Sequence, residues 1–184
     1  MPRIYGKSWR KLGAASNSGP LIHLAKVHAL YLLRELYGDI FIPEEVKVEV
    51  VERGKSKGFA DALMVEEAIR EGWIKVVAVE VLHRILEVAR VAGVHDAEAK
   101  VIWYAYENDL LVLLDDEPAR EFARSLGLKV RGTLGVLLES VRRGILERRR
   151  ALELLDDVAQ IMYLSADVCN AVKREIEGIS ENDA

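Results

Sequence analysis

Five consecutive aliphatic residues, 110–114, form the most apolar run of the 184-residue chain, and Asp115 and Asp116 follow it directly. A strand without polar alternation is typical of a parallel sheet covered on both faces, because neither face meets water. Helical patterns separate this run from four other short β-like runs, at residues 12–16, 40–42, 74–77 and 129–130. Since parallel strands need crossover helices, this order predicts an α/β fold with a parallel sheet of about five short strands sandwiched by helices.

The length and composition predict one domain. Half of the residues are hydrophobic and 30% are charged, which is enough to build one full-sized core, and no linker-like stretch separates a second one. We expect a basic extension at residues 1–11, a core domain at 12–144, and a helical tail at 145–184 packed on the same domain. The glycines and lysines of residues 53–58 predict a mobile loop.

Candidate metal ligands follow the ends of several predicted elements. Asn17 comes after the first strand, Asp115 and Asp116 follow the most apolar strand, and Glu49 and Glu98 lie in helices after other loops. Ligands of parallel sheets bind outside the carboxyl ends of the strands, so these side chains are expected to converge. Oxygen ligands gathered from distant segments suit a hard divalent cation, and the sequence therefore indicates a Mg²⁺ or Mn²⁺ site.

Each of these acids also has a simpler interpretation when it is taken alone. Glu49 fits a solvated acid beside Glu45, and Asp115 and Asp116 fit the N-cap of the following helix. Glu98 fits the favourable charge of a first helical turn. Only their joint placement at one sheet edge favours the metal site.

Other features narrow the class of protein. The single cysteine, Cys169, excludes an intrachain disulfide and a cysteine-based zinc site. No apolar run has the length of a secretory signal or a membrane span, so we expect a soluble cytoplasmic protein with no membrane contact. The net charge of −4 argues against a uniformly basic surface, but basic stretches at residues 3–11 and 142–150 are candidate RNA contacts. The four histidines lack zinc spacing, and the apolar neighbours of His23 favour a hydrogen-bonded core role.

The chain resembles the PIN-domain superfamily over about residues 12–144. More narrowly, it is similar to a prokaryotic branch of unknown function that is related to VapC-type toxins. The resemblance is carried by these segments, in chain order: 16–26 (SNSGPLIHLAK), 42–50 (IPEEVKVEV), 97–98, 114–120 (LDDEPAR) and 132–138 (GTLGVLL). The last segment is the most specific.

The resemblance implies a small ribonuclease that uses Mg²⁺ or Mn²⁺ to hydrolyse RNA phosphodiesters. It also implies a homodimer and a toxin that is silenced by a co-expressed antitoxin protein. By motif position, Asn17 stands where the family has its first Asp, Glu49 its second acid, and Glu98 its third. Asp115 or Asp116 stands at the fourth position, and the spacing slightly favours Asp116.

Asn17 departs from the family pattern. An amide oxygen can still bind Mg²⁺, but the lost charge weakens a site whose affinity depends on charge count. We interpret the site as active, with a metal affinity lowered by Asn17. Ser18 and Thr133 are the expected hydrogen-bond donors to a phosphate or to a metal-bound water. The alternatives are a non-catalytic PIN-like binding or dimerisation module with a degenerate acidic site, and a metal-dependent hydrolase of small phosphate esters.

Overall fold

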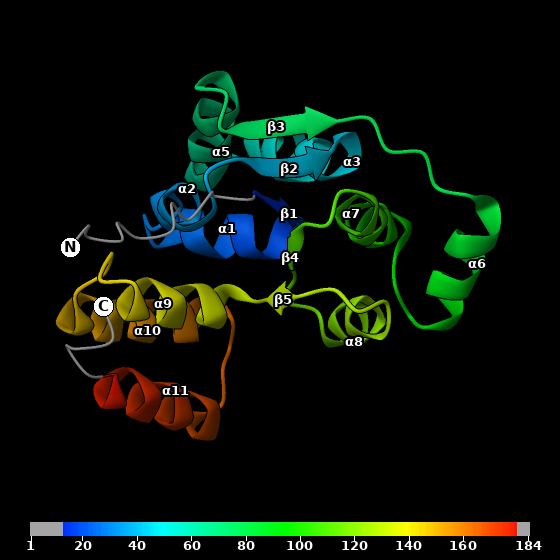
Figure 1. Ribbon diagram of the computed structural model, residues 1–184. Helices are drawn as coiled ribbons and strands as arrows, with labels where there is room; N and C mark the ends of the chain where they lie inside the picture. Colours follow the sequence, from blue (N-terminus) through cyan, green and yellow to red (C-terminus); the bar gives the residue numbers. More distant parts are fainter. Residues whose placement is uncertain (1–12, 180–184) are drawn as a thin grey trace, which may run out of the picture.

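The computed structural model describes residues 13–179 and contains one five-stranded sheet of order β3-β2-β1-β4-β5 (Figure 1). The strands are β1 (Ala14–Ser16), β2 (Ile40–Pro43), β3 (Ile74–Val77), β4 (Leu111–Leu113) and β5 (Val130–Arg131). All neighbouring strands are parallel, and Ala15 of β1 pairs with Phe41 on one side and Val112 on the other. The predicted α/β fold with a parallel sheet is confirmed.

The order of the strands reverses beside β1. The chain passes outward from β1 to β2 and β3, then returns to place β4 on the other side of β1 and β5 beyond it. The connections that leave β1 and β4 therefore diverge to opposite sides. Such a reversal opens a crevice at the carboxyl ends of the two strands, where ligands of open α/β sheets bind.

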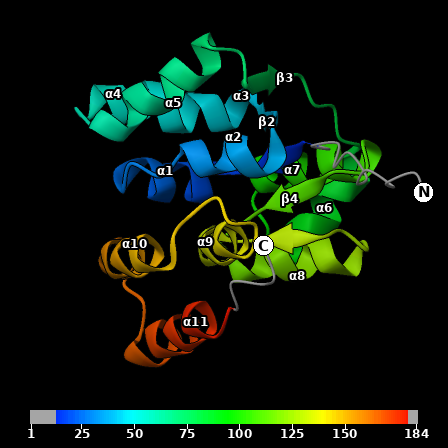
Figure 2. The same cartoon turned by 60° about the vertical axis from the view of Figure 1, so that its left-hand side comes forward.

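Two layers of helices enclose the sheet (Figure 2). One layer contains α6 (His83–Val91), α7 (Asp96–Glu107) and α8 (Glu117–Ser125), and α7 packs across β1, β2 and β4. The other contains α1 (Ser18–Lys26), α2 (Tyr31–Tyr37), α5 (Ala60–Arg70) and α9 (Thr133–Arg142). After β2 come α3 (Glu44–Lys47), the π-helix η1 (Val48–Arg53) and α4 (Gly54–Ser56).

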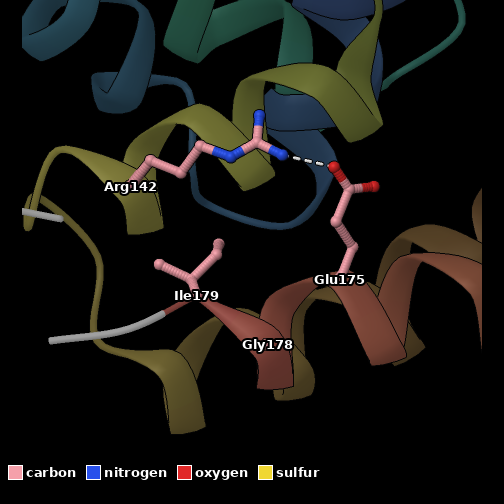
Figure 3. A pocket seen from close by; sticks show the side chains of 4 residues that line it. All are labelled: Arg142, Glu175, Gly178 and Ile179. Carbon is pink, nitrogen blue, oxygen red and sulfur yellow. Dashed lines mark hydrogen bonds and ion pairs between the residues drawn. The ribbon is translucent and has the colours of Figure 1, made fainter.

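The C-terminal helices, α10 (Arg148–Ile161) and α11 (Ala166–Gly178), pack on the outer side of α9 (Figures 1 and 2). Their buried residues are apolar: Ala151, Leu154, Leu155, Val158, Val172 and Ile176. An ion pair between Arg142 and Glu175 joins α9 to α11 beside a small pocket that Gly178 and Ile179 also line (Figure 3). This pocket lies at the end of α9 opposite to Thr133. Across residues 13–179, no helix combines the length and apolar character needed to cross a bilayer.

The predicted loop at residues 53–58 is wrong in part, because α4 continues the helical course of η1 through this region. Gly54 explains the error. It is buried, and a Cβ atom at Gly54 would lie 2.7 Å from the Cβ of Ala62 on α5. The glycine therefore allows two helices to approach closely, whereas the composition of residues 53–58 had indicated a flexible connection.

Gly54→Ala should lower the free energy of unfolding by about 1–3 kcal/mol, the usual range for overpacking a core. The added methyl group has to displace the Ala62 side chain or the helix that carries it. Chemical denaturation measures the loss, and Gly178→Ala is the control, since nothing lies within 4 Å of a Cβ there. Equal stability of the two variants would contradict the close packing of η1, α4 and α5.

Candidate active site

Three adjacent strands deliver polar residues to the edge where the strand order reverses. Asn17 follows β1 directly, Asp115 follows β4, and Thr133 begins α9 just after β5. Because β1, β4 and β5 are neighbours in a parallel sheet, their carboxyl ends share one side of the molecule. The convergence that the sequence predicted for Asn17 and Asp115 is therefore present at this edge.

Asp115 is fixed by a set of hydrogen bonds. Its Oδ1 accepts from the backbone N–H of Thr133 at 2.7 Å, and its Oδ2 accepts from Thr133 Oγ1 at 2.6 Å and from His23 Nδ1 at 2.8 Å. Thr133 is fully buried, and only 11% of the Asp115 side chain is exposed. Burial alone would raise the pKa of Asp115, but the hydrogen bonds from His23 and Thr133 outweigh it and hold the pKa below its usual value.

Asp115→Asn should lower the free energy of unfolding at neutral pH by about 1–3 kcal/mol, because hydrogen bonds to a charged partner are lost. A depressed carboxyl pKa stabilises the fold above the pKa of the unfolded chain, and that stability is lost as the pH falls through the pKa of the folded protein. The difference between wild type and variant should therefore narrow towards acid pH. Urea titrations at several pH values measure it, with exposed Asp109→Asn as the control. A difference that does not depend on pH would contradict the assignment.

Asn17 does not make the hydrogen bond that is usual for an asparagine at a helix N-cap. It is the N-cap residue of α1, where Asn normally accepts a hydrogen bond from the first turn, but here its side chain makes no capping bond. The side chain instead donates from Nδ2 to Glu98 Oε1 at 3.3 Å. Asn17 is 6% exposed, and within the described part of the chain its buried Oδ1 has no hydrogen-bond partner. An unpaired buried acceptor costs about 1–3 kcal/mol, which suggests that this oxygen is reserved for a ligand.

Gly19 leaves space beside this oxygen. A Cβ atom at Gly19 would lie 3.6 Å from Asn17 Oδ1 and 3.3 Å from Asp115 Oδ2. The two oxygens therefore flank the same spot over the first turn of α1. A side chain at position 19 would fill it.

Glu98 stands in the first turn of α7, facing Asn17. It is half-buried, and its Oε2 accepts from the backbone N–H of His95 at 3.1 Å as part of a capping box. Burial and then the charge of Asp116 raise the pKa of Glu98 above its usual value, although the hydrogen bonds from His95 and Asn17 act in the opposite direction. Burial and a neighbouring negative charge both destabilise an ionised carboxylate, and a nearby cation would stabilise it.

Asp116 is exposed and caps α8, since its Oδ2 accepts from the backbone N–H of Ala119 at 3.1 Å. This is the simpler role that the sequence allowed for it. The capping bond uses Oδ2, and Asp116 is close enough to Glu98 to influence its pKa. Both carboxylate oxygens of Asp115 accept hydrogen bonds, whereas Asp116 accepts one through Oδ2 only. Asp116 therefore has more capacity left to bind a cation.

The other predicted site residues have less contact with this edge. Glu49 lies exposed in the first turn of η1, where it forms no hydrogen bond or ion pair with the described residues. The helix η1 packs against α1, and π-helical turns occur often at functional sites. Ser18 opens α1 without a side-chain hydrogen bond to the described residues. Glu49 and Ser18 therefore stay predictions.

Within residues 13–179, no three His, Cys, Asp or Glu side chains gather closely enough to hold an ion by themselves. Asn17 and Glu98 are joined by a hydrogen bond, and the Asp116 carboxylate lies near enough to Glu98 to raise its pKa. Oxygen donors of this kind suit Mg²⁺ or Mn²⁺, and Mg²⁺ commonly takes only one or two carboxylates and retains water ligands.

Two residues of the edge were not assigned a functional role from the sequence. His23 was expected in the core, but it is only half-buried and binds Asp115. Its spacing of four residues from Gly19 places both on one face of α1, which is a signal the sequence contained. Arg120, four residues after Asp116, lies beside Gly132 at the same edge.

A parallel α/β domain with acidic residues at the reversal of its strand order has the architecture of a PIN domain. Residues 14–178 match the family described as DUF3368, a PIN domain, and the chain belongs to this family. The resemblance seen in the sequence is thereby confirmed. No curated protein and no solved structure matches the chain.

Proposed function

We propose that this PIN domain is a Mg²⁺- or Mn²⁺-dependent endoribonuclease of the cytoplasm, with Asn17, Glu98 and Asp116 as its metal-binding residues. The main support is the state of Asn17, a buried N-cap residue: its side chain makes no capping bond and donates to the Glu98 carboxylate, and its carbonyl oxygen has no hydrogen-bond partner among residues 13–179. A divalent cation is the ligand that this set of oxygens fits best.

The residues at this edge have different proposed roles. Asn17 Oδ1, Glu98 and Asp116 would hold the ion, with Glu49 as a further predicted donor. When bound there, such an ion would supply a water molecule of lowered pKa and would offset charge on the phosphoryl oxygens. Hydrogen bonds from His23 and Thr133 hold the Asp115 carboxylate in one orientation, so its negative charge has a fixed position at the edge. A proton on Glu98 competes with a bound cation, and because the pKa of Glu98 is raised, activity should begin to fall at a higher pH than an ordinary glutamate would produce.

The family membership supports a nuclease that uses divalent metals, while the narrower role rests on the sequence resemblance. We propose on that basis a VapC-like toxin that acts on RNA as a homodimer and is silenced by a small antitoxin protein. Growth arrest on expression of the wild-type chain, relieved by Glu98→Gln, is the expected result. Arrest that is equal for both chains would contradict the toxin role.

The purified chain tests the enzyme directly. We expect cleavage of single-stranded RNA in Mn²⁺ or Mg²⁺, none in EDTA, and no comparable hydrolysis of p-nitrophenyl phosphate. Preferred hydrolysis of the small ester would favour the phosphoesterase alternative. RNA that stays intact in both metals, with Glu98→Gln identical to wild type, would favour a non-catalytic binding module.

A further inference from the structure

We propose that Arg120 is a substrate-binding residue whose guanidinium group takes a phosphate of single-stranded RNA at the edge of the metal site. This inference rests on the proposed nuclease function and names a residue that function does not yet use. Three features of Arg120 support it: its position, the weakness of its contacts with the described residues, and the negative charge around it.

Arg120 lies in α8, one turn after the N-cap Asp116, and reaches towards β5. A Cβ atom at Gly132 would lie 2.7 Å from Arg120 Nη1 and 2.8 Å from Asp115 Oδ1. The guanidinium group and the fixed carboxylate thus flank the backbone of Gly132. A phosphate that approaches the metal-binding residues from the β5 side meets Arg120.

The hydrogen-bonding capacity of Arg120 is largely unused. Its buried Nε makes no hydrogen bond to any residue between 13 and 179; Glu117 Oε2 lies 3.4 Å away but not along the N–H direction. Glu117 is mostly exposed and also receives a hydrogen bond from Arg124 Nη1 at 3.0 Å. The Arg120 side chain is only 27% exposed, so a cation with five donors is partly removed from water, and among the described residues it has one weak partner, Glu117.

The second basic stretch differs in this respect. Its arginines have intramolecular partners: Arg142 with Glu175, Arg143 with Glu139, Arg148 with the carbonyl oxygen of Ile179, and Arg149 and Arg150 with Glu153. These pairings lie at the far end of α9 and on the tail. Arg120 is therefore the better candidate for contact with the substrate.

The charge of the edge explains why a cation is needed there. Glu98, Asp115 and Asp116 repel a phosphodiester, and guanidinium groups bind phosphate oxygens through two parallel hydrogen bonds. Gly132 keeps the place open, because any side chain there would collide with the guanidinium group. A purely structural Arg120 would instead serve only to pair with Glu117 along α8, as Arg124 does.

The test compares Arg120→Ala with Arg124→Ala, which removes a cation that shares the same acidic partner. Fluorescence anisotropy in EDTA measures binding of a labelled oligouridine over a series of salt concentrations. Arg120→Ala should weaken binding about tenfold or more, because a charge-assisted contact is lost. The slope of log K against log salt should become shallower by about 0.7 for one lost phosphate contact, and Arg124→Ala should leave it unchanged.

A further variant separates a lost phosphate contact from a folding defect. Arg120→Lys should keep the salt slope while losing part of the affinity. Arg120→Ala should bind Mn²⁺ at least as tightly as wild type, because the substitution removes a positive charge near the acidic residues. Equal affinities and slopes for the Arg120 and Arg124 variants would overturn the inference, while metal-dependent cleavage by wild type would still support the nuclease. Binding that depends on Arg120 without any cleavage would overturn the nuclease alone, and a wild type that binds no RNA would overturn both.

Discussion

Glu98→Gln should abolish metal-dependent RNA cleavage, with a loss of at least about 10³-fold, since a metal contributes several kcal/mol of transition-state stabilisation. The substitution keeps the shape of the side chain and removes its charge. Mn²⁺ binding, followed by calorimetry, should weaken in parallel. The control is Glu107→Gln, at the exposed C-terminal end of the same helix, which should leave both cleavage and Mn²⁺ binding unchanged.

The same variant should not be less stable in EDTA. The pKa of Glu98 is raised by burial and by Asp116, so its ionised form costs the folded state free energy at neutral pH. The cost is present above the folded pKa and disappears below the ordinary pKa of glutamate, where the side chain is protonated in both states. A glutamine amide can also donate to Asn17 Oδ1 if the Asn17 amide turns over. Marked destabilisation of Glu98→Gln at neutral pH, without loss of Mn²⁺ binding, would show that Glu98 is structural.

Asn17→Asp should have opposite effects in EDTA and in Mn²⁺. In EDTA the new carboxylate is buried beside Glu98, and we expect a loss of about 1–3 kcal/mol because a buried group loses its partner. In Mn²⁺ the added charge should strengthen binding about tenfold, since affinity rises with the charge of the ligands. Thermal unfolding in the two solutions, analysed as ligand-linked stabilisation, measures both effects.

Ser18→Ala, one residue further along, is the control for Asn17→Asp. Ser18 makes no side-chain hydrogen bond to the described residues, so its removal should change the stability in EDTA little. If Asn17→Asp is as stable as wild type in EDTA and gains no extra stabilisation from Mn²⁺, Asn17 does not face a cation site.

The sheet was predictable because its evidence is local. The apolar run that ends at Asp115 has the composition of a strand covered on both faces, and the alternation with helices leaves only a parallel arrangement. The position of Asn17 and Asp115 at one edge then follows from the direction of the strands. Gly54 shows the limit of such reasoning, because a glycine that permits close packing has the same sequence signal as one in a loop.

The partners of the site residues were not predictable in this way. Whether Asp115 is free or saturated depends on the rotamers of His23 and Thr133, which come from segments far apart in the chain. The apolar neighbours of His23 in the sequence suggested a core role, but His23 lies on a face of α1 that is directed towards the edge of the sheet, where it contacts Asp115. Asn at an N-cap predicts a capping bond, so packing in three dimensions is also the reason why the Asn17 oxygen has no partner among the residues that the structure describes.

A crystal structure of the protein soaked in Mn²⁺, with the ion located by its anomalous scattering, would show whether this edge of the sheet binds a divalent cation. We expect an ion bound by Asn17 Oδ1 and Glu98, with Asp116 within reach directly or through water. No anomalous peak at this edge at millimolar Mn²⁺, or a peak whose ligands exclude both Asn17 and Glu98, would contradict it.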